Sequence, residues 1–141
     1  MANFDIAYRR TLGTEGGYVN DPRDKGGETY MGISRKAHPN SDIWTIIDKV
    51  DKTGKSNRYI TNVLKRNSHL THKIKMIYKN EYWDVFMLDN CKSQKLANEI
   101  FDDAVNRGVA NAAYLLHSIF DLPAVRKVTP QLLSKIIGHT V

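Results

Sequence analysis

Three residues near the start of the chain, Glu15, Asp24 and Thr29, have types and spacing that suit hydrolytic chemistry. They lie nine and five residues apart, in a stretch, residues 15–32, that holds five glycines. Hydrolysis of a glycosidic bond needs a carboxylic acid to protonate the leaving oxygen, and a polar group across the cleft to manage water or the developing cation. Glycines let the backbone turn tightly and approach a polymer closely. Glu15 is therefore our candidate for the general acid.

The residue types do not decide which residue acts with Glu15 as the second catalytic group. Asp24 is a candidate for orienting the attacking water in an inverting mechanism or for acting as the nucleophile in a retaining one, which the separation of the two carboxyl groups decides. An aspartate beside proline or glycine is also a common turn former, and Asp21 and Glu28 are competing carboxylates. Thr29 is a candidate for holding a water opposite Glu15, or it ends a turn.

The segments around these residues are predicted to be mostly helical. Apolar residues recur at helical spacing over residues 3–13, and residues 19–29 have the composition of a loop or short hairpin. Glu15 then lies at the junction of the first helix and the loop. Further helices are expected over residues 31–37, 41–50, 56–65, 68–82, 93–107 and 112–119, and from Thr129 to Gly138. The sequence therefore predicts a mainly α protein with a Gly-rich loop or short hairpin after the first helix.

The sequence EGGYVNDPRDKGGETYMGIS, residues 15–34, resembles the signature of glycoside hydrolase family 108. Members of this family are N-acetylmuramidases, also called secretion activator proteins. The resemblance is dense over residues 12–34 and continues through Tyr78, residues 82–84 (YWD) and residues 101–108 (FDDAVNRG). The order Glu, Asp, Thr is also similar to the catalytic residues of phage lysozymes. The resemblance implies a lysozyme-like helical fold in which Glu15, Asp24 and Thr29 are catalytic.

The same resemblance implies hydrolysis of the β-1,4 bond between N-acetylmuramic acid and N-acetylglucosamine in peptidoglycan strands, with no cofactor. Four residues are candidates for binding the substrate. Tyr18 suits a hydrogen bond to Glu15 or stacking on a sugar, or it is half-buried core. Tyr82 and Trp83 form a sugar-stacking platform or belong to the core, and Asn106 lies near the cleft or caps a helix.

By this resemblance, residues 1–92 form the catalytic region. Residues 93–141 form a helical region similar to the family's peptidoglycan-binding segment, and we expect the two to pack as one unit. The alternative is a non-enzymatic wall-binding or secretion-accessory protein that retains the fold. A small basic helical nucleic-acid binder is a further alternative, from composition alone.

The charge of the chain is uneven. The formal net charge is +6, and residues 42–80 hold nine Lys and Arg against three Asp, which gives that segment the same charge. A basic surface suits an anionic polymer, such as those of the bacterial cell wall, although a solvated helical face with no partner is the alternative. We expect no specific nucleic-acid partner and no membrane insertion.

Cysteine and histidine usage excludes other classes of site. Cys91 is the only cysteine, so an intramolecular disulfide is excluded. His69 and His72 have helical spacing but no cysteine or carboxylate neighbour in a zinc pattern, so no metal site is expected. Residues 1–5 do not look like a signal peptide. We therefore expect synthesis in the bacterial cytoplasm and action at the cell wall, after export through a holin-like or dedicated route.

Overall fold

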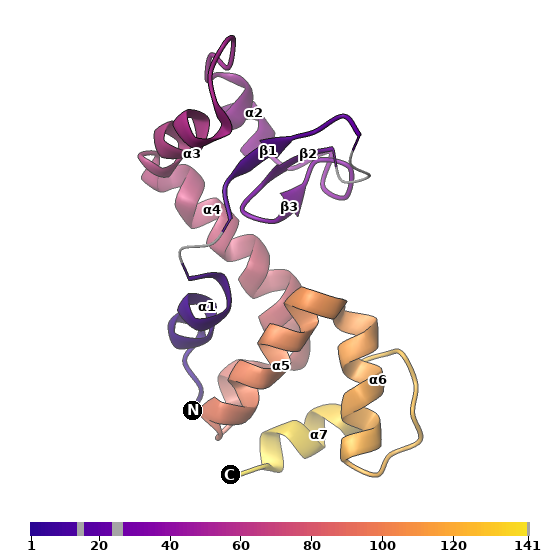
Figure 1. The fold of residues 1–141 in the computed structure, drawn as a ribbon. Coiled ribbons are helices and arrows are strands. Elements are labelled where there is room, and N and C mark those ends of the chain that lie inside the picture. Colours follow the sequence, from indigo (N-terminus) through magenta and orange to yellow (C-terminus); the bar gives the residue numbers. More distant parts are fainter. Residues whose placement is uncertain (14–15, 24–26, 141) are drawn as a thin grey trace. The chain divides into compact units, whose positions relative to one another are not determined.

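The computed structural model describes residues 1–13, 16–23 and 27–140 (Figure 1). The chain divides into two compact units. The first unit contains residues 1–13 and 77–141, and the second contains residues 14–76. The described residues are mainly helical, with one small antiparallel sheet in the second unit.

The first unit is helical. Its elements are α1 (Phe4–Leu12), the π-helical turn η1 (Lys79–Trp83), the 3-10 turns η2 (Asp84–Phe86) and η3 (Leu88–Asn90), α5 (Gln94–Arg107), α6 (Val109–Ile119) and α7 (Pro130–Gly138). Three of the helices begin at a side chain that accepts a hydrogen bond from a backbone N–H of the first turn, and these capping residues are Asn3, Ser93 and Thr129. Such caps satisfy backbone donors that a helix start leaves unpaired.

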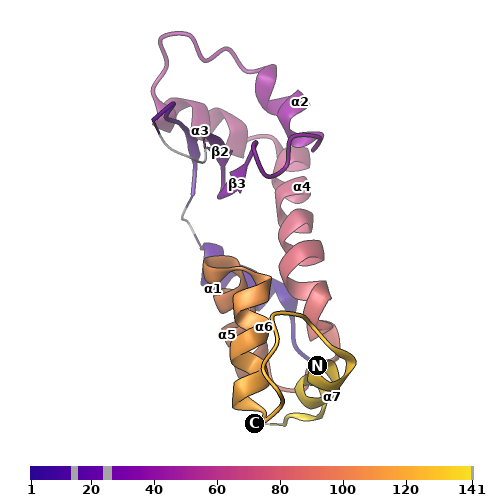
Figure 2. The same ribbon diagram turned by 90° about the vertical axis from the view of Figure 1, so that its right-hand side faces the viewer.

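Aromatic rings form the centre of the first unit. Phe4, Trp83 and Phe101 meet edge to face, with ring centroids 5.4 to 6.0 Å apart. Helix α1 packs along α5, as both Figure 1 and Figure 2 show. The N–H of Ala2 also donates to the carbonyl oxygen of Cys91 at 2.7 Å. The start of the chain is therefore held against the segment that leads into α5.

The second unit combines a three-stranded sheet with helices. Its elements are β1 (Tyr18–Asn20), β2 (Glu28–Tyr30), β3 (Ile33–Ser34), α2 (Ile43–Asp48), α3 (Asn57–Lys65) and α4 (Ser68–Tyr78), the last two residues of α4 belonging to the first unit. The strands pair antiparallel in the order β1-β2-β3. Residues 21–27 connect β1 to β2, so the Gly-rich segment forms a β-hairpin (Figure 1).

The two faces of the sheet differ in burial. Tyr18 lies opposite Tyr30, and Tyr30 lies opposite Ile33; all three side chains are buried. Side chains alternate along a strand, so Val19 and Thr29, which are also paired, point to the other face. Val19 is 41% exposed. One face of the hairpin thus belongs to the core, and the other is accessible.

The mainly α class and the hairpin after the first helix are confirmed, and most predicted helices are present. The helix predicted over residues 31–37 is wrong. Met31 and Gly32 have φ angles of 51° and 80°, which a right-handed helix cannot contain, and β3 follows them. The compact units also do not divide at residue 92. The division into residues 1–92 and 93–141 concerns function and stays a prediction.

Candidate active site

The Gly-rich motif lies in the second unit, in and around the β1–β2 hairpin. Tyr18, the first residue of β1, is three residues after Glu15 in the chain. Glu15 and Asp24 lie outside the described residues, so their catalytic roles stay predictions. The described residues next to Glu15 show how the chain is held at this point.

The two glycines that follow Glu15 make close contacts on two sides. Gly16 has a φ of 87°, and a Cβ there would lie 3.1 Å from the Cα of Met31. A Cβ on Gly17 would lie 2.8 Å from Oγ1 of Thr61 in α3. The carbonyl oxygen of Gly17 accepts a hydrogen bond from the N–H of Met31 at 3.1 Å. A side chain at either glycine would therefore force a shift of the glycine or of its neighbour, close to Glu15 in the chain.

Helix α3 holds the start of β1 through one side chain. Oγ1 of Thr61 accepts a hydrogen bond from the N–H of Tyr18 at 2.8 Å. The same hydroxyl donates to the carbonyl oxygen of Asn57 at 2.7 Å. The chain is thus fixed to α3 on one side and to the β2–β3 turn on the other.

Ionisable side chains form a network on the buried side of the hairpin. The hydroxyl of Tyr18 donates to Oε2 of Glu28 at 2.5 Å, and Nη1 of Arg35 donates to Oε1 of Glu28 at 2.8 Å. The guanidinium of Arg35 also makes two hydrogen bonds of 2.8 Å to the carboxylate of Asp48, the last residue of α2. Both oxygens of Glu28 therefore have partners. This carboxylate supports the hairpin and is a poor candidate for the catalytic partner of Glu15.

This network keeps the Tyr18 hydroxyl protonated, Arg35 positively charged and Asp48 negatively charged. Burial, followed by the hydrogen bond to Glu28, raises the pKa of the Tyr18 hydroxyl. The hydrogen bonds from Arg35 lower the pKa of Asp48, and Asp48 and Glu28 raise the pKa of Arg35. At neutral pH Tyr18 is thus a neutral donor between β1 and β2. Tyr18 as a whole is only 3% exposed, which leaves no free face of its ring for stacking on a sugar.

Thr29 occupies a different position from Glu28 and Tyr30. It lies in β2, the central strand, opposite Val19 in β1 and Ser34 in β3. Its side chain is half-buried and points away from the core face of the sheet. Thr29 is therefore placed where its hydroxyl can meet a water or a substrate.

The other predicted substrate contacts belong to the first unit. Trp83 is fully buried, and its Nε1 donates to Oδ1 of Asp89 at 2.8 Å. Its indole is thus part of the core, which was the alternative to a sugar-stacking role in the sequence analysis. No face of the ring is free to contact a sugar. Tyr82 is half-buried, with its ring centroid 5.6 Å from that of Tyr78.

Asn106 is exposed in the last turn of α5. Its Nδ2 donates to the carbonyl oxygen of Asp102, one turn earlier, at 2.9 Å. The residue that ends the helix is Gly108, whose φ is 89°. Asn106 is therefore not the C-cap, and its predicted role in substrate binding stays a prediction.

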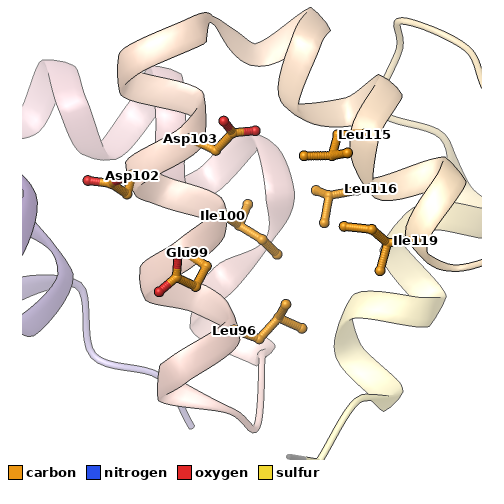
Figure 3. Close-up of a pocket in the computed structure, with 8 residues that line it drawn as sticks. All are labelled: Leu96, Glu99, Ile100, Asp102, Asp103, Leu115, Leu116 and Ile119. Carbon is orange, nitrogen blue, oxygen red and sulfur yellow. The ribbon is translucent and has the colours of Figure 1, made fainter.

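A groove of about 310 Å³ lies between α5 and α6 in the first unit (Figure 3). Aliphatic side chains of both helices point into it, and these are Leu96, Ile100, Leu115, Leu116 and Ile119. Sugar sites need polar groups that converge on the ligand. The interior of this groove is apolar, so it is a weak candidate for a glycan site.

The three carboxylates beside this groove are already engaged. Glu99 pairs with Arg10 at 2.9 Å, and Asp103 pairs with Arg107 one turn later in α5. Asp102 accepts a hydrogen bond from the hydroxyl of Thr11 at 3.1 Å. Over residues 1–13, 16–23 and 27–140, no group of three or more His, Cys, Asp or Glu side chains is arranged to hold a metal ion. Within the same ranges, no helix is long and apolar enough to cross a membrane.

Two residues that hold the hairpin were missed by the sequence analysis. Arg35 directly follows the motif and lies seven residues after Glu28 in the sequence. A hairpin can bring residues at this separation together, so this spacing could have indicated the ion pair. Thr61 lies 43 residues from Tyr18 and looks like an ordinary helical threonine, so no signal in the sequence indicates its contact.

Comparisons with known proteins agree with the fold and the motif. The sequence profile of the family described as Glycosyl hydrolase 108 matches residues 8–108. Among solved structures, the chain is similar to SagA from Brucella abortus, with a TM-score of 0.61 and 24% sequence identity. The alignment covers 94% of this chain and 67% of the SagA chain. A comparison with curated protein sequences found no match.

The Tyr18–Glu28 hydrogen bond is expected to contribute to stability. Because the carboxylate is largely buried, Glu28→Met, which removes the acceptor at similar size, and Tyr18→Phe should each cost about 1–3 kcal/mol in the free energy of unfolding. Since the two side chains interact directly, the double variant should show a coupling of about 0.5–3 kcal/mol. Urea unfolding followed by circular dichroism measures these values.

The matched control is Asp48→Asn, which weakens the exposed part of the same network. The side chain of Asp48 is 49% exposed, so this change should cost less than about 1 kcal/mol. Additive effects of Glu28→Met and Tyr18→Phe would contradict the hydrogen bond.

Proposed function

Because the chain belongs to the glycosyl hydrolase 108 family, we propose that it is a peptidoglycan hydrolase of the N-acetylmuramidase type. It is a glycoside hydrolase with a mainly α, lysozyme-like fold. The proposed reaction is hydrolysis of the β-1,4 bond between N-acetylmuramic acid and N-acetylglucosamine. The observation that supports it best is the family match, which includes the entire hairpin and Glu15.

Glu15 is the proposed general acid. It must hold a proton at neutral pH to protonate the leaving oxygen, so we expect a poorly hydrated surrounding that raises its pKa. Its position in the chain supports this role, because Gly17 and Tyr18 are fixed by Met31 and Thr61. An acid needs such a rigid support, since proton transfer depends on its placement.

Asp24 and Thr29 are the proposed partners. Two other carboxylates of the hairpin are engaged, because Glu28 binds Tyr18 and Arg35, while Asp21 accepts a hydrogen bond from the N–H of Arg23 at 2.9 Å. Asp21 thus acts as a turn former. This favours Asp24 as the group that orients the attacking water, with Thr29 as a second contact to it. Such an arrangement gives inversion at the anomeric carbon, with the carboxyl groups roughly 6.5–9.5 Å apart.

The surface of α3 supports attraction to an anionic envelope. No Asp or Glu occurs in residues 52–80. Arg58, Lys65 and Arg66 are exposed, and none of them pairs with a described carboxylate. Lys55 lies nearby in the chain, with its Nζ 4.9 Å from the ring centroid of Tyr59. We propose that this basic surface of α3, formed by Lys55, Arg58, Lys65 and Arg66, attracts anionic cell-wall polymers.

Removal of the proposed acid should abolish most of the activity. Glu15→Gln keeps the size of the side chain, so the fold should persist while the rate on purified peptidoglycan falls on the order of 100- to 10,000-fold. Release of reducing ends measures the rate, and circular dichroism checks the fold.

Glu99→Gln serves as the control, since Glu99 is exposed in the first unit, and it should keep the wild-type rate. A folded Glu15→Gln protein with near wild-type activity would contradict the assignment of the acid. Wild-type protein that binds peptidoglycan without cleaving it would instead favour the non-enzymatic alternative.

Charge reversal on the basic surface of α3 should weaken action on intact walls only. The double variant Arg58→Glu/Lys65→Glu should lower activity on whole sacculi at low salt and leave activity on short soluble glycan unchanged. The difference from wild type should shrink as salt rises, because exposed charges are screened within about 10 Å at 0.1 M and about 3 Å at 1 M.

The control is Lys92→Glu/Lys95→Glu, which makes the same charge change at exposed positions of the first unit. An equal loss in this variant would show that net charge, and not the surface of α3, attracts the wall.

A further inference from the structure

We propose that Thr61 is a positioning residue for the general acid. Its hydroxyl fixes the backbone at Tyr18, and thereby the chain that leads from Glu15 into β1. The inference rests on the proposed role of Glu15 in hydrolysis. It assigns a function to a residue of α3 that is distant in sequence from the Gly-rich motif.

The hydrogen bonds of Thr61 fix the direction of its hydroxyl. The proton of Oγ1 is donated to the carbonyl oxygen of Asn57 at 2.7 Å, so a lone pair remains for the N–H of Tyr18 at 2.8 Å. A hydroxyl has one proton and two acceptor positions. Thr61 therefore acts as an acceptor with a defined orientation, held by its own helix.

Gly17 allows this contact. A Cβ at position 17 would lie 2.8 Å from Oγ1 and 3.2 Å from Cγ2 of Thr61, which is closer than ordinary contacts allow. The backbone thus passes directly against the Thr61 side chain. On the other side the carbonyl oxygen of Gly17 accepts the N–H of Met31. The chain is restrained from two directions at the first residues after Glu15.

Loss of the hydroxyl would release one of these two restraints. Residues 16 and 17 are glycines, which rotate more freely than other residues. Without the hydrogen bond to Tyr18, the segment could swing about these glycines while the Met31 contact remains. An acid displaced by a fraction of an ångström transfers its proton less effectively.

This effect differs from a general loss of stability. A misplaced acid lowers the rate of the chemical step, whereas sugar contacts elsewhere in the site still bind the substrate. The expected signature is a lower kcat with an unchanged KM, which indicates loss of an interaction used only in the transition state. A purely structural role would change the melting temperature with no selective effect on kcat.

Thr71 provides a matched control. Its hydroxyl also donates to a carbonyl oxygen one turn earlier, that of Asn67, at 3.1 Å. It is exposed in α4, the next helix of the same unit. A Thr→Val change there removes the same kind of local helical bond at an exposed position of a different helix.

The experiment compares Thr61→Val, Thr61→Ser and Thr71→Val on soluble, uncrosslinked peptidoglycan strands. Thr61→Val should lower kcat on the order of 10- to 100-fold, with KM within about 2-fold of wild type. Thr61→Ser keeps the hydroxyl and should retain near wild-type kcat, as should Thr71→Val. Amide hydrogen exchange at Tyr18 should accelerate in Thr61→Val alone. All variants are assayed below their melting temperatures.

Several outcomes would overturn the positioning role. They are an unchanged kcat in Thr61→Val, an equal loss in Thr61→Ser, or an equal loss in Thr71→Val. If Thr61→Val does not fold, Thr61→Ala carries the same test, and misfolding of both would mean that the hydroxyl serves the fold as a whole. Wild-type protein that does not cleave the strands would instead refute the proposed function, while exchange at Tyr18 would still report the hydrogen bond.

Discussion

The structure around the motif depends on the close approach of the backbone at Gly16 and Gly17 to two neighbours. The β2–β3 turn approaches from one side through Met31, and α3 approaches from the other through Thr61. A Cβ at Gly17 would clash with Thr61, and one at Gly16 would crowd Met31 at a positive φ, so both positions favour glycine. The residue before them is Glu15, and we therefore interpret the Gly-Gly pair as the means by which the chain next to the proposed acid is held in place.

Tyr18, Glu28 and Arg35, the other ionisable groups of the hairpin described above, have a structural role. Tyr18 and Glu28 appear in the sequence as a tyrosine and a carboxylate near a candidate acid, yet they bind each other on the buried face. Arg35 completes the arrangement and joins it to α2. Charged groups with satisfied hydrogen bonds stabilise a fold and are less available for proton transfer. This leaves Thr29, on the accessible face, as the described side chain that suits the proposed role in handling water, while the role of Asp24 stays a prediction.

Much of the fold could be predicted from the sequence, because its local signals agree with the structure. Ser93 caps α5, and the Thr129–Pro130 pair starts α7, as side-chain caps and a first-turn proline predict. The wrong helix prediction and the missed contact each have a physical cause. Residues 31–37 resemble a helix in composition, but left-handed angles at Met31 and Gly32 turn the chain into β3. The hydrogen bond between Thr61 and Tyr18 joins residues that are 43 apart in the sequence. The spacing of apolar residues predicts helices and strands, but it does not predict a tertiary hydrogen bond.

The proposed muramidase action has a direct chemical signature, the identity of the new reducing end. Purified peptidoglycan is digested with wild-type protein, the products are reduced with borohydride, and the terminal sugar is identified by mass spectrometry. Cleavage of the β-1,4 bond after N-acetylmuramic acid places that sugar at the reducing end, so a muramidase yields N-acetylmuramitol. Products that end in N-acetylglucosaminitol, or an undigested polymer, would contradict it.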